Sequence, residues 1–90
     1  MLGKEPPCEL TLYSRYACPL CDDMQYTLQD FSTDMHFQVT VVDIDNDPQL
    51  RAQYNEAVPI LVLGDREVCR HFFDLDALKK AVDTQRSVAQ

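Results

Sequence analysis

The order of hydrophobic and polar residues predicts where this chain forms strands and helices. Residues 9–14 alternate between apolar and polar side chains, which is typical of a strand with Leu10 and Leu12 on one face. Residues 37–44 are rich in β-branched side chains and predict a second strand. Between the two, apolar residues recur at helical spacing, namely Met24, Leu28, Phe31 and Met35. We therefore expect a helix that begins at the cysteine pair in residues 18–21.

The middle of the chain predicts a short helix and a hairpin. An Asp-Pro pair opens a helix that we expect over residues 47–55, because aspartate caps a helix and proline suits its first turn. The continuous apolar run of residues 60–63 is typical of a strand buried on both faces. Gly64 and Asp65 then form a two-residue turn signal, and residues 66–72 are expected to return as an antiparallel strand.

The last predicted element is a helix capped by Asp74. Its inward-facing residues are expected to be Leu75, Leu78, Ala81 and Val82. The polar tail of residues 83–90 is expected to fray. The element order is then βαβαββα, in which the first two strands run parallel because a helix joins them. This order predicts a single α/β domain over residues 1–90, with its core at about residues 9–82.

Composition and charge narrow the range of functions. A chain of 90 residues, 46% of them hydrophobic and 26% charged, is typical of one folded domain. Fifteen acidic residues against eight basic ones give a net charge of −7, which disfavours binding to nucleic acid or to anionic lipid. The sequence shows no signal peptide and no apolar run long enough to span a membrane. We therefore expect a cytoplasmic protein whose cysteines serve chemistry.

Cys18 and Cys21 form a Cys-x-x-Cys motif between a predicted strand and a predicted helix, which is typical of thioredoxin-like redox sites. A sulfur at a helix amino terminus meets free amide donors that favour the thiolate, so Cys18 is the expected nucleophile. Cys21 lies one turn further and is expected to resolve the mixed disulfide. Arg15 should lower the pKa of Cys18 further, whereas Asp22 and Asp23 oppose this effect.

Residues 13–21, together with Val58 and Pro59 before a strand, resemble the glutaredoxin branch of the thioredoxin superfamily. The resemblance covers about residues 9–82 and implies a thioredoxin-like fold, with a four-stranded mixed sheet flanked by helices. It also implies a thiol–disulfide oxidoreductase that acts on protein disulfides or glutathione mixed disulfides. In that family the proline is cis, and the backbone of the residue before it pairs with the substrate. The resemblance therefore implies a cis Pro59 and a substrate-pairing Val58.

The same resemblance implies how glutathione, a possible co-substrate, would bind. Arg15 matches a basic residue that contacts a glutathione carboxylate, and Asp74 or Asp76 matches an acidic residue at the start of the last helix. The family's Gly-Gly turn is missing from residues 69–76, and Leu20 replaces a usual aromatic residue. The predicted catalytic residues are Cys18 and Cys21, and the predicted substrate-binding residues are Arg15, Tyr16, Pro19, Leu20, Val58, Pro59 and Asp74.

Other interpretations stay open beside this one. Cys18 and Cys21 form half of a zinc site if Cys69 and His71 supply the rest, although that spacing is unusually tight. Cys69 is otherwise expected to pack in the core, and the acidic run of residues 43–47 to be a solvated turn. We expect no metal, no tightly bound cofactor and a monomer. Two alternative functions are a dithiol enzyme reduced by a protein reductase and a non-catalytic module that senses redox state or binds a partner.

Overall fold

The computed structural model describes residues 7–88 of the chain. Its elements follow the expected order, with short 3-10 turns at Ile44–Asn46 and Asn55–Ala57. The strands are β1 (Cys8–Ser14), β2 (Phe37–Asp43), β3 (Ile60–Leu63) and β4 (Arg66–Arg70). The helices are α1 (Pro19–Met35), α2 (Pro48–Tyr54) and α3 (Leu75–Val88). No helix among the described residues is long and apolar enough to cross a membrane.

The four strands form one mixed sheet in the order β2-β1-β3-β4. Strand β1 pairs in parallel with β2, as the connecting helix requires, and antiparallel with β3. Strands β3 and β4 form the expected hairpin, with Gly64 in its turn at a φ of 62°. The architecture is therefore the predicted thioredoxin-like α/β fold.

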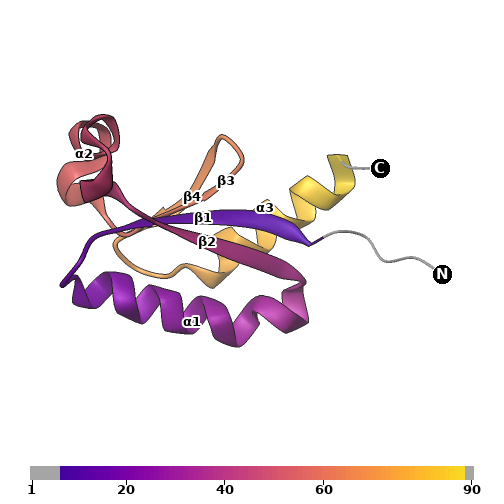
Figure 1. Cartoon of the computed structure of the whole chain (residues 1–90). Coiled ribbons are helices and arrows are strands. Elements are labelled where there is room, and N and C mark those ends of the chain that lie inside the picture. The colour runs from indigo at the N-terminus through magenta and orange to yellow at the C-terminus, as the bar shows by residue number, and fades with distance from the viewer. Residues whose placement is uncertain (1–6, 89–90) are drawn as a thin grey trace.

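Helices α1 and α3 lie on one face of the sheet and α2 lies on the other, as Figure 1 shows. The larger core cluster fills the space under α1 and α3. It includes Leu10, Leu12, Met24, Leu28, Leu61, Leu78 and Val82. A smaller cluster forms near α2 from Cys21, Ile44 and Val58, with Tyr13, Leu50 and Tyr54 packed against it. Successive side chains of β1 point to opposite faces of the sheet, so this one strand contributes residues to both clusters.

Several strand ends differ from the sequence prediction. Strand β1 already begins at Cys8, which pairs with Phe37 of β2. Strand β2 ends at Asp43, one residue early, because the Asp43 carboxylate accepts a hydrogen bond from the amide of Asp45 and caps a 3-10 turn. Strand β4 ends at Arg70 because His71 adopts a positive φ of 67°, outside the extended region of regular strands.

The carboxyl-terminal helix is longer than the sequence predicted. We expected fraying from residue 83, but α3 continues to Val88, so that prediction is wrong for the described part of the tail. The guanidinium of Arg86 donates hydrogen bonds to the backbone carbonyls of Met35 and His36, at 2.5 Å and 3.2 Å. These bonds hold the last turns of α3 against the end of α1. Residues 89–90 lie outside the described residues.

Candidate functional site

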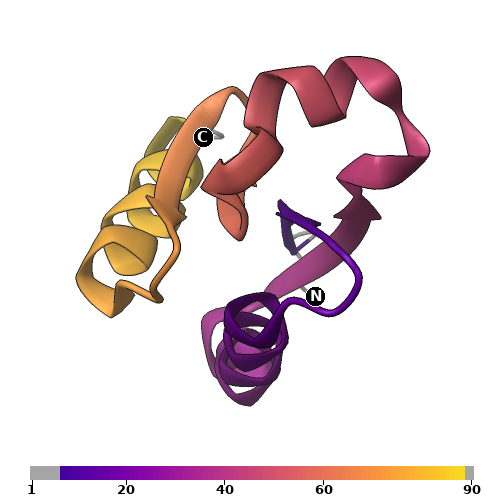
Figure 2. The same ribbon diagram turned by 90° about the vertical axis from the view of Figure 1, so that its left-hand side faces the viewer.

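The cysteine pair lies where β1 passes into α1, at the end of the molecule that faces the viewer in Figure 2. Cys18 is the N-cap residue of α1, and Pro19 follows at the first helical position. Cys18 and Cys21 form a disulfide, with their Cα atoms 5.2 Å apart. The backbone amide of Cys21 donates a hydrogen bond to Sγ of Cys18 across 3.1 Å. The helix amino terminus therefore meets the Cys18 sulfur, as the sequence predicted.

The two sulfurs differ in their exposure to solvent. Cys21 retains only 2% of its surface and packs with Ile44 and Val58 in the smaller core cluster. Cys18 is half-buried and packs against the edge of that cluster. A substrate disulfide can therefore approach Cys18, whereas Cys21 is reached only from within the protein.

Val58 and Pro59 also belong to this site. The bond between them is cis, as the resemblance implied, and Val58 packs in the same cluster as Cys21. The carbonyl of Pro59 accepts a hydrogen bond from the amide of His71 at 2.7 Å. This bond connects the Val58–Pro59 segment to the turn between β4 and α3. The disulfide thus packs against the Val58–Pro59 segment, which in turn bonds to the turn after β4.

Arg15 forms a two-point ion pair with Asp45. Its Nε donates to Oδ2 at 3.1 Å and its Nη2 donates to Oδ1 at 2.9 Å, in the fork geometry that suits guanidinium and carboxylate. The hydrogen bond raises the pKa of Arg15 and lowers that of Asp45. Nη1 also donates to the carbonyl of Asn55 at 3.5 Å. The cation expected to serve a glutathione carboxylate therefore already has a carboxylate partner.

The acidic run of residues 43–47 forms a turn at the surface, as the sequence suggested, but its carboxylates also have structural partners. Asp43 caps the 3-10 turn, Asp45 pairs with Arg15, and Asp47 caps α2 by accepting a hydrogen bond from the amide of Gln49 at 2.9 Å. Each carboxylate thus has a specific structural partner. The partner of Asp45 lies thirty residues away in sequence, so local patterns gave no sign of it.

The turn between β4 and α3 lacks glycine but contains a backbone conformation that glycine favours. His71 has a φ of 67°, and the amide of Phe72 donates to the carbonyl of Arg70 at 2.7 Å. These two features are those of a tight three-residue γ-turn. The absence of glycine therefore does not prevent a sharp turn here, because His71 adopts the positive φ.

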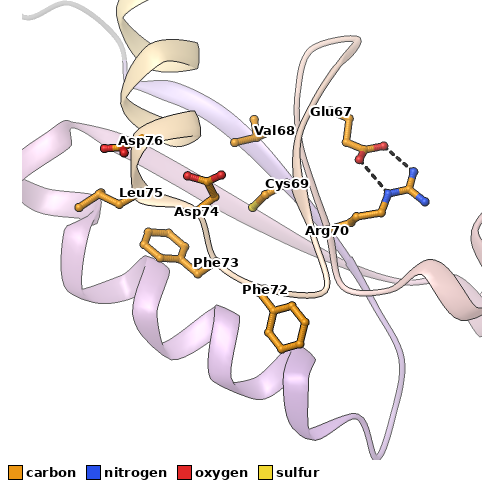
Figure 3. Close-up of a pocket in the computed structure, with 9 residues that line it drawn as sticks. All are labelled: Glu67, Val68, Cys69, Arg70, Phe72, Phe73, Asp74, Leu75 and Asp76. Atoms are coloured by element: carbon orange, nitrogen blue, oxygen red, sulfur yellow. Dashed lines mark hydrogen bonds and ion pairs between the residues drawn. The ribbon is translucent and has the colours of Figure 1, made fainter.

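Asp74 follows this turn and caps α3. Its Oδ1 accepts a hydrogen bond from the amide of Ala77 at 3.0 Å, as the sequence predicted for the helix start. Asp74 lines an open hollow of about 600 Å³ between β4 and the start of α3. Figure 3 shows its carboxylate beside Cys69 and Val68. Cys69 also lines this hollow.

Three large apolar side chains on the segments that build this site are exposed to solvent. Tyr16 is 90% exposed and Leu20 is 39% exposed, and both lie beside or within the Cys-x-x-Cys segment. Phe72, 69% exposed, projects from the turn that contacts Pro59. Sequence reasoning singled out the first two but missed Phe72, because nothing in the sequence distinguishes it from Phe73. Phe73 is partly buried and stacks on Phe31 with ring centroids 5.6 Å apart.

The other two cysteines are free and buried. Cys8 and Cys69 both belong to the larger core cluster, in agreement with the packing role expected for Cys69. Burial raises the pKa of the Cys69 thiol, which opposes formation of a reactive thiolate. Among residues 7–88, no group of three or more histidine, cysteine or acidic side chains is arranged to hold a metal ion. The structure thus gives the zinc interpretation no support.

A model of the glutaredoxin-like domain (DUF836) matches residues 9–83, which are most of the chain and include every residue of the site. The chain belongs to the glutaredoxin-like family. A family relative is the uncharacterized protein Rv0508 of Mycobacterium tuberculosis, 25% identical over 84 residues, or 88% of this chain and 84% of that protein.

Two solved structures place this glutaredoxin-like chain among known folds. The solution structure of protein Ne2328 from Nitrosomonas europaea has a TM-score of 0.78 and 31% sequence identity, and the match covers 90% of this chain and 98% of that one. The solution structure of glutaredoxin from Brucella melitensis has a TM-score of 0.59 at 21% identity, over 97% of this chain and 91% of that one. At this level of identity, the similarity to the Brucella glutaredoxin is one of fold alone.

Proposed function

We propose that this protein is a thiol–disulfide oxidoreductase in which Cys18 attacks the substrate and Cys21 resolves the intermediate. The observation that carries the proposal is the contrast between the two sulfurs. Sγ of Cys18 accepts the helix amide and is partly open to solvent, whereas Cys21 is 2% exposed. Amide donors favour the thiolate, which is the nucleophilic form of cysteine.

The reaction proceeds in two exchange steps. The Cys18 thiolate attacks one sulfur of a substrate disulfide, the substrate S–S bond breaks, and the released thiolate takes a proton to become a thiol. Cys21 then loses its proton and attacks Sγ of Cys18, which releases the second substrate thiolate for protonation. The substrate gains two electrons and two protons, and the protein is left with the Cys18–Cys21 disulfide seen in the structure.

The surrounding residues have distinct proposed roles. The backbone of Val58, next to the cis Pro59, pairs with the bound substrate, and Pro19 stiffens the segment between the sulfurs. Tyr16 and Leu20 offer exposed apolar contacts. Asp74 keeps its amide partner in α3 and adds negative charge at the turn. The substrates are protein disulfides or glutathione mixed disulfides, and the protein acts as a cytoplasmic monomer.

A thiol donor must reduce the disulfide again for turnover. Glutathione is one candidate, but the ion pair between Arg15 and Asp45 occupies the cation that would receive its carboxylate. This observation favours a second candidate, a dithiol protein that is itself kept reduced by a reductase. Supplying either glutathione or a thioredoxin-type system in a coupled assay of substrate reduction distinguishes the two donors.

The proposal is tested with reduced Cys21→Ser protein and oxidised glutathione. We expect one glutathione to be added at Cys18, because the resolving thiol is absent and the mixed disulfide is trapped. Mass spectrometry of peptides locates the adduct. The Cys18→Ser variant is the matched control and should form no adduct at Cys21. An equal absence of adducts in both variants, also with a neutral disulfide, would support a non-catalytic module instead.

A further inference from the structure

The charges around the disulfide are predominantly negative. Asp22 and Asp23 directly follow the resolving cysteine in the first turns of α1, and both are exposed. Neither belongs to an ion pair, since the pairs recorded within residues 7–88 are Arg15–Asp45 and Arg70–Glu67. Two uncompensated carboxylates therefore lie within one helical turn or so of the reacting sulfurs.

The cations nearest this site are neutralised. Arg15, three residues before Cys18, is held by both oxygens of Asp45. Asp43 and Glu56 add further negative potential at Arg15, so three carboxylates face this guanidinium. Arg51 of α2 adds positive potential at Asp45. These two cations and three anions leave a local charge of −1.

At the end of β4 a second arginine is likewise neutralised by a carboxylate. Arg70 directly precedes the turn residue that bonds to Pro59, and Glu67 receives its Nε and Nη2 at 2.8 Å and 2.6 Å. Asp74 then caps α3 and Asp76 lies in its first turn. The lysines of the described residues, Lys79 and Lys80, follow only in the second turn.

The exposed apolar side chains suit a polypeptide more than a small polar thiol. Tyr16 and Leu20 lie on the cysteine segment, and Phe72 projects from the turn connected to Pro59, where Figure 3 shows its ring on the α1 side of the loop. Large exposed apolar groups around a reactive centre provide contact area for the side chains of a partner.

We propose that the preferred substrates are disulfides carried on positively charged polypeptide segments, and that Asp45 sets this preference by withholding Arg15 from anionic substrates. The inference rests on the proposed oxidoreductase function and adds the charge of the substrate to it. A field of one sign around a reactive site raises the local concentration of the opposite charge and accelerates encounter by about 10- to 1,000-fold. The same field repels oxidised glutathione, which is anionic at neutral pH.

Three peptide disulfides of one design test the preference. Each is a symmetric disulfide of a five-residue peptide with a central cysteine, flanked by lysines, by serines or by glutamates. Protein reduced with dithiothreitol and then desalted is mixed with each peptide, and release of peptide thiol is followed in a single turnover. The same peptides reacted with dithiothreitol alone supply reference rates that correct for their intrinsic reactivity.

At low ionic strength, the corrected rate with the lysine peptide should exceed that with the glutamate peptide by about tenfold or more. The ratio should shrink towards one as salt is added, because salt screens charges beyond roughly 3–10 Å. Equal corrected rates, or a faster glutamate peptide, would overturn the inference. The serine peptide reports the underlying function, so a failure to oxidise the protein with any peptide rejects the oxidoreductase itself.

The role of Asp45 is tested by Asp45→Asn, which frees the Arg15 charge. We expect the glutamate peptide to react several-fold faster than with wild type, while the serine peptide changes less than twofold. Asp34→Asn, an equal charge change in the last turn of α1, is the matched control and should leave the ratio unchanged. The double variant Asp22→Asn with Asp23→Asn should lower the lysine preference without touching the ion pair. An identical response of the Asp34 and Asp45 variants would show that net charge alone is responsible and would refute the role of Asp45.

Discussion

The backbone amide of Cys21 donates its hydrogen bond to the sulfur of Cys18, so the resolving residue stabilises the sulfur that it later attacks. The two cysteines are neighbours on one helical turn, yet only Cys18 has its side chain at the helix terminus. Backbone geometry therefore assigns the two roles before any neighbouring charge is considered.

This relationship predicts the order of alkylation in the reduced protein. Iodoacetamide near pH 6.5 should label Cys18 before Cys21, because Cys18 is stabilised as a thiolate and is the more exposed of the two. Peptide mass spectrometry at short reaction times measures the order. Labelling of Cys21 first would contradict the assignment, and the same experiment in urea, where both should react alike, is the control.

Removal of the α3 cap predicts a loss of stability. Asp74→Ala should lower the free energy of unfolding by about 1 kcal/mol, because the amide of Ala77 loses its carboxylate acceptor. Urea unfolding followed by circular dichroism measures the change. Asp76→Ala removes an equal charge from the first turn of α3 and should cost less. Equal losses in the two variants would show that charge rather than capping is responsible.

The turn residue His71 predicts a contrast between two substitutions. His71→Gly should leave the free energy of unfolding within about 1 kcal/mol of wild type, because glycine adopts positive φ freely. His71→Val should cost about 1–2 kcal/mol more, since a β-branched residue strongly resists this conformation. Both variants lose the bond between Nε2 of His71 and the carbonyl of Glu56, so the loss of this bond cancels in their difference. Equal urea midpoints would contradict the conformational argument.

The buried thiol of Cys69 predicts a pH dependence of stability. Burial raises its pKa in the folded protein above the ordinary value of 9.0. The unfolded thiol ionises first, so the stabilisation by this group is present below pH 9 and is lost as pH rises through the folded-state pKa. Tyr54, whose pKa burial also raises, acts in the same direction at higher pH.

Comparison with Cys69→Ala isolates the thiol from the tyrosine. Urea midpoints measured between pH 8 and pH 10.5 should fall more steeply in wild type than in this variant, since both proteins retain Tyr54. Parallel curves would show that Cys69 does not ionise on unfolding in this range. Alkylation of Cys69 below pH 9 should also be much slower in the folded protein than in urea.

The sequence predicted the fold well because its main determinants are local. Helical spacing of Met24 and Leu28, and alternation around Leu10, directly reflect burial under α1 and along β1. Strand ends were less predictable, because Asp43 and His71 end β2 and β4 through their own hydrogen bonding and backbone conformation. Such local hydrogen bonds and backbone conformations override strand propensity, and they become visible only in the folded chain.

In the candidate site, too, some features follow from local sequence and others depend on contacts between distant residues. The positions of Cys18 and Cys21 follow from the start of α1, a local event. The neutralised charge of Arg15 does not, because Asp45 approaches only through the pairing of β1 with β2 and the turn that follows. The length of α3 was missed for a similar reason, since Arg86 bonds to backbone carbonyls about fifty residues earlier.

The strand β1 and the helix α3 run in opposite directions relative to the end of the molecule that holds the disulfide. Strand β1 begins far from the disulfide and runs towards it, whereas α3 begins at the turn near Pro59 and runs away from it (Figure 1). The beginning of the first strand and the end of the last helix therefore lie at the end remote from the cysteines. A fluorescent reporter or a surface linker attached at either place stays away from the disulfide, which makes this fold suitable for an immobilised redox probe.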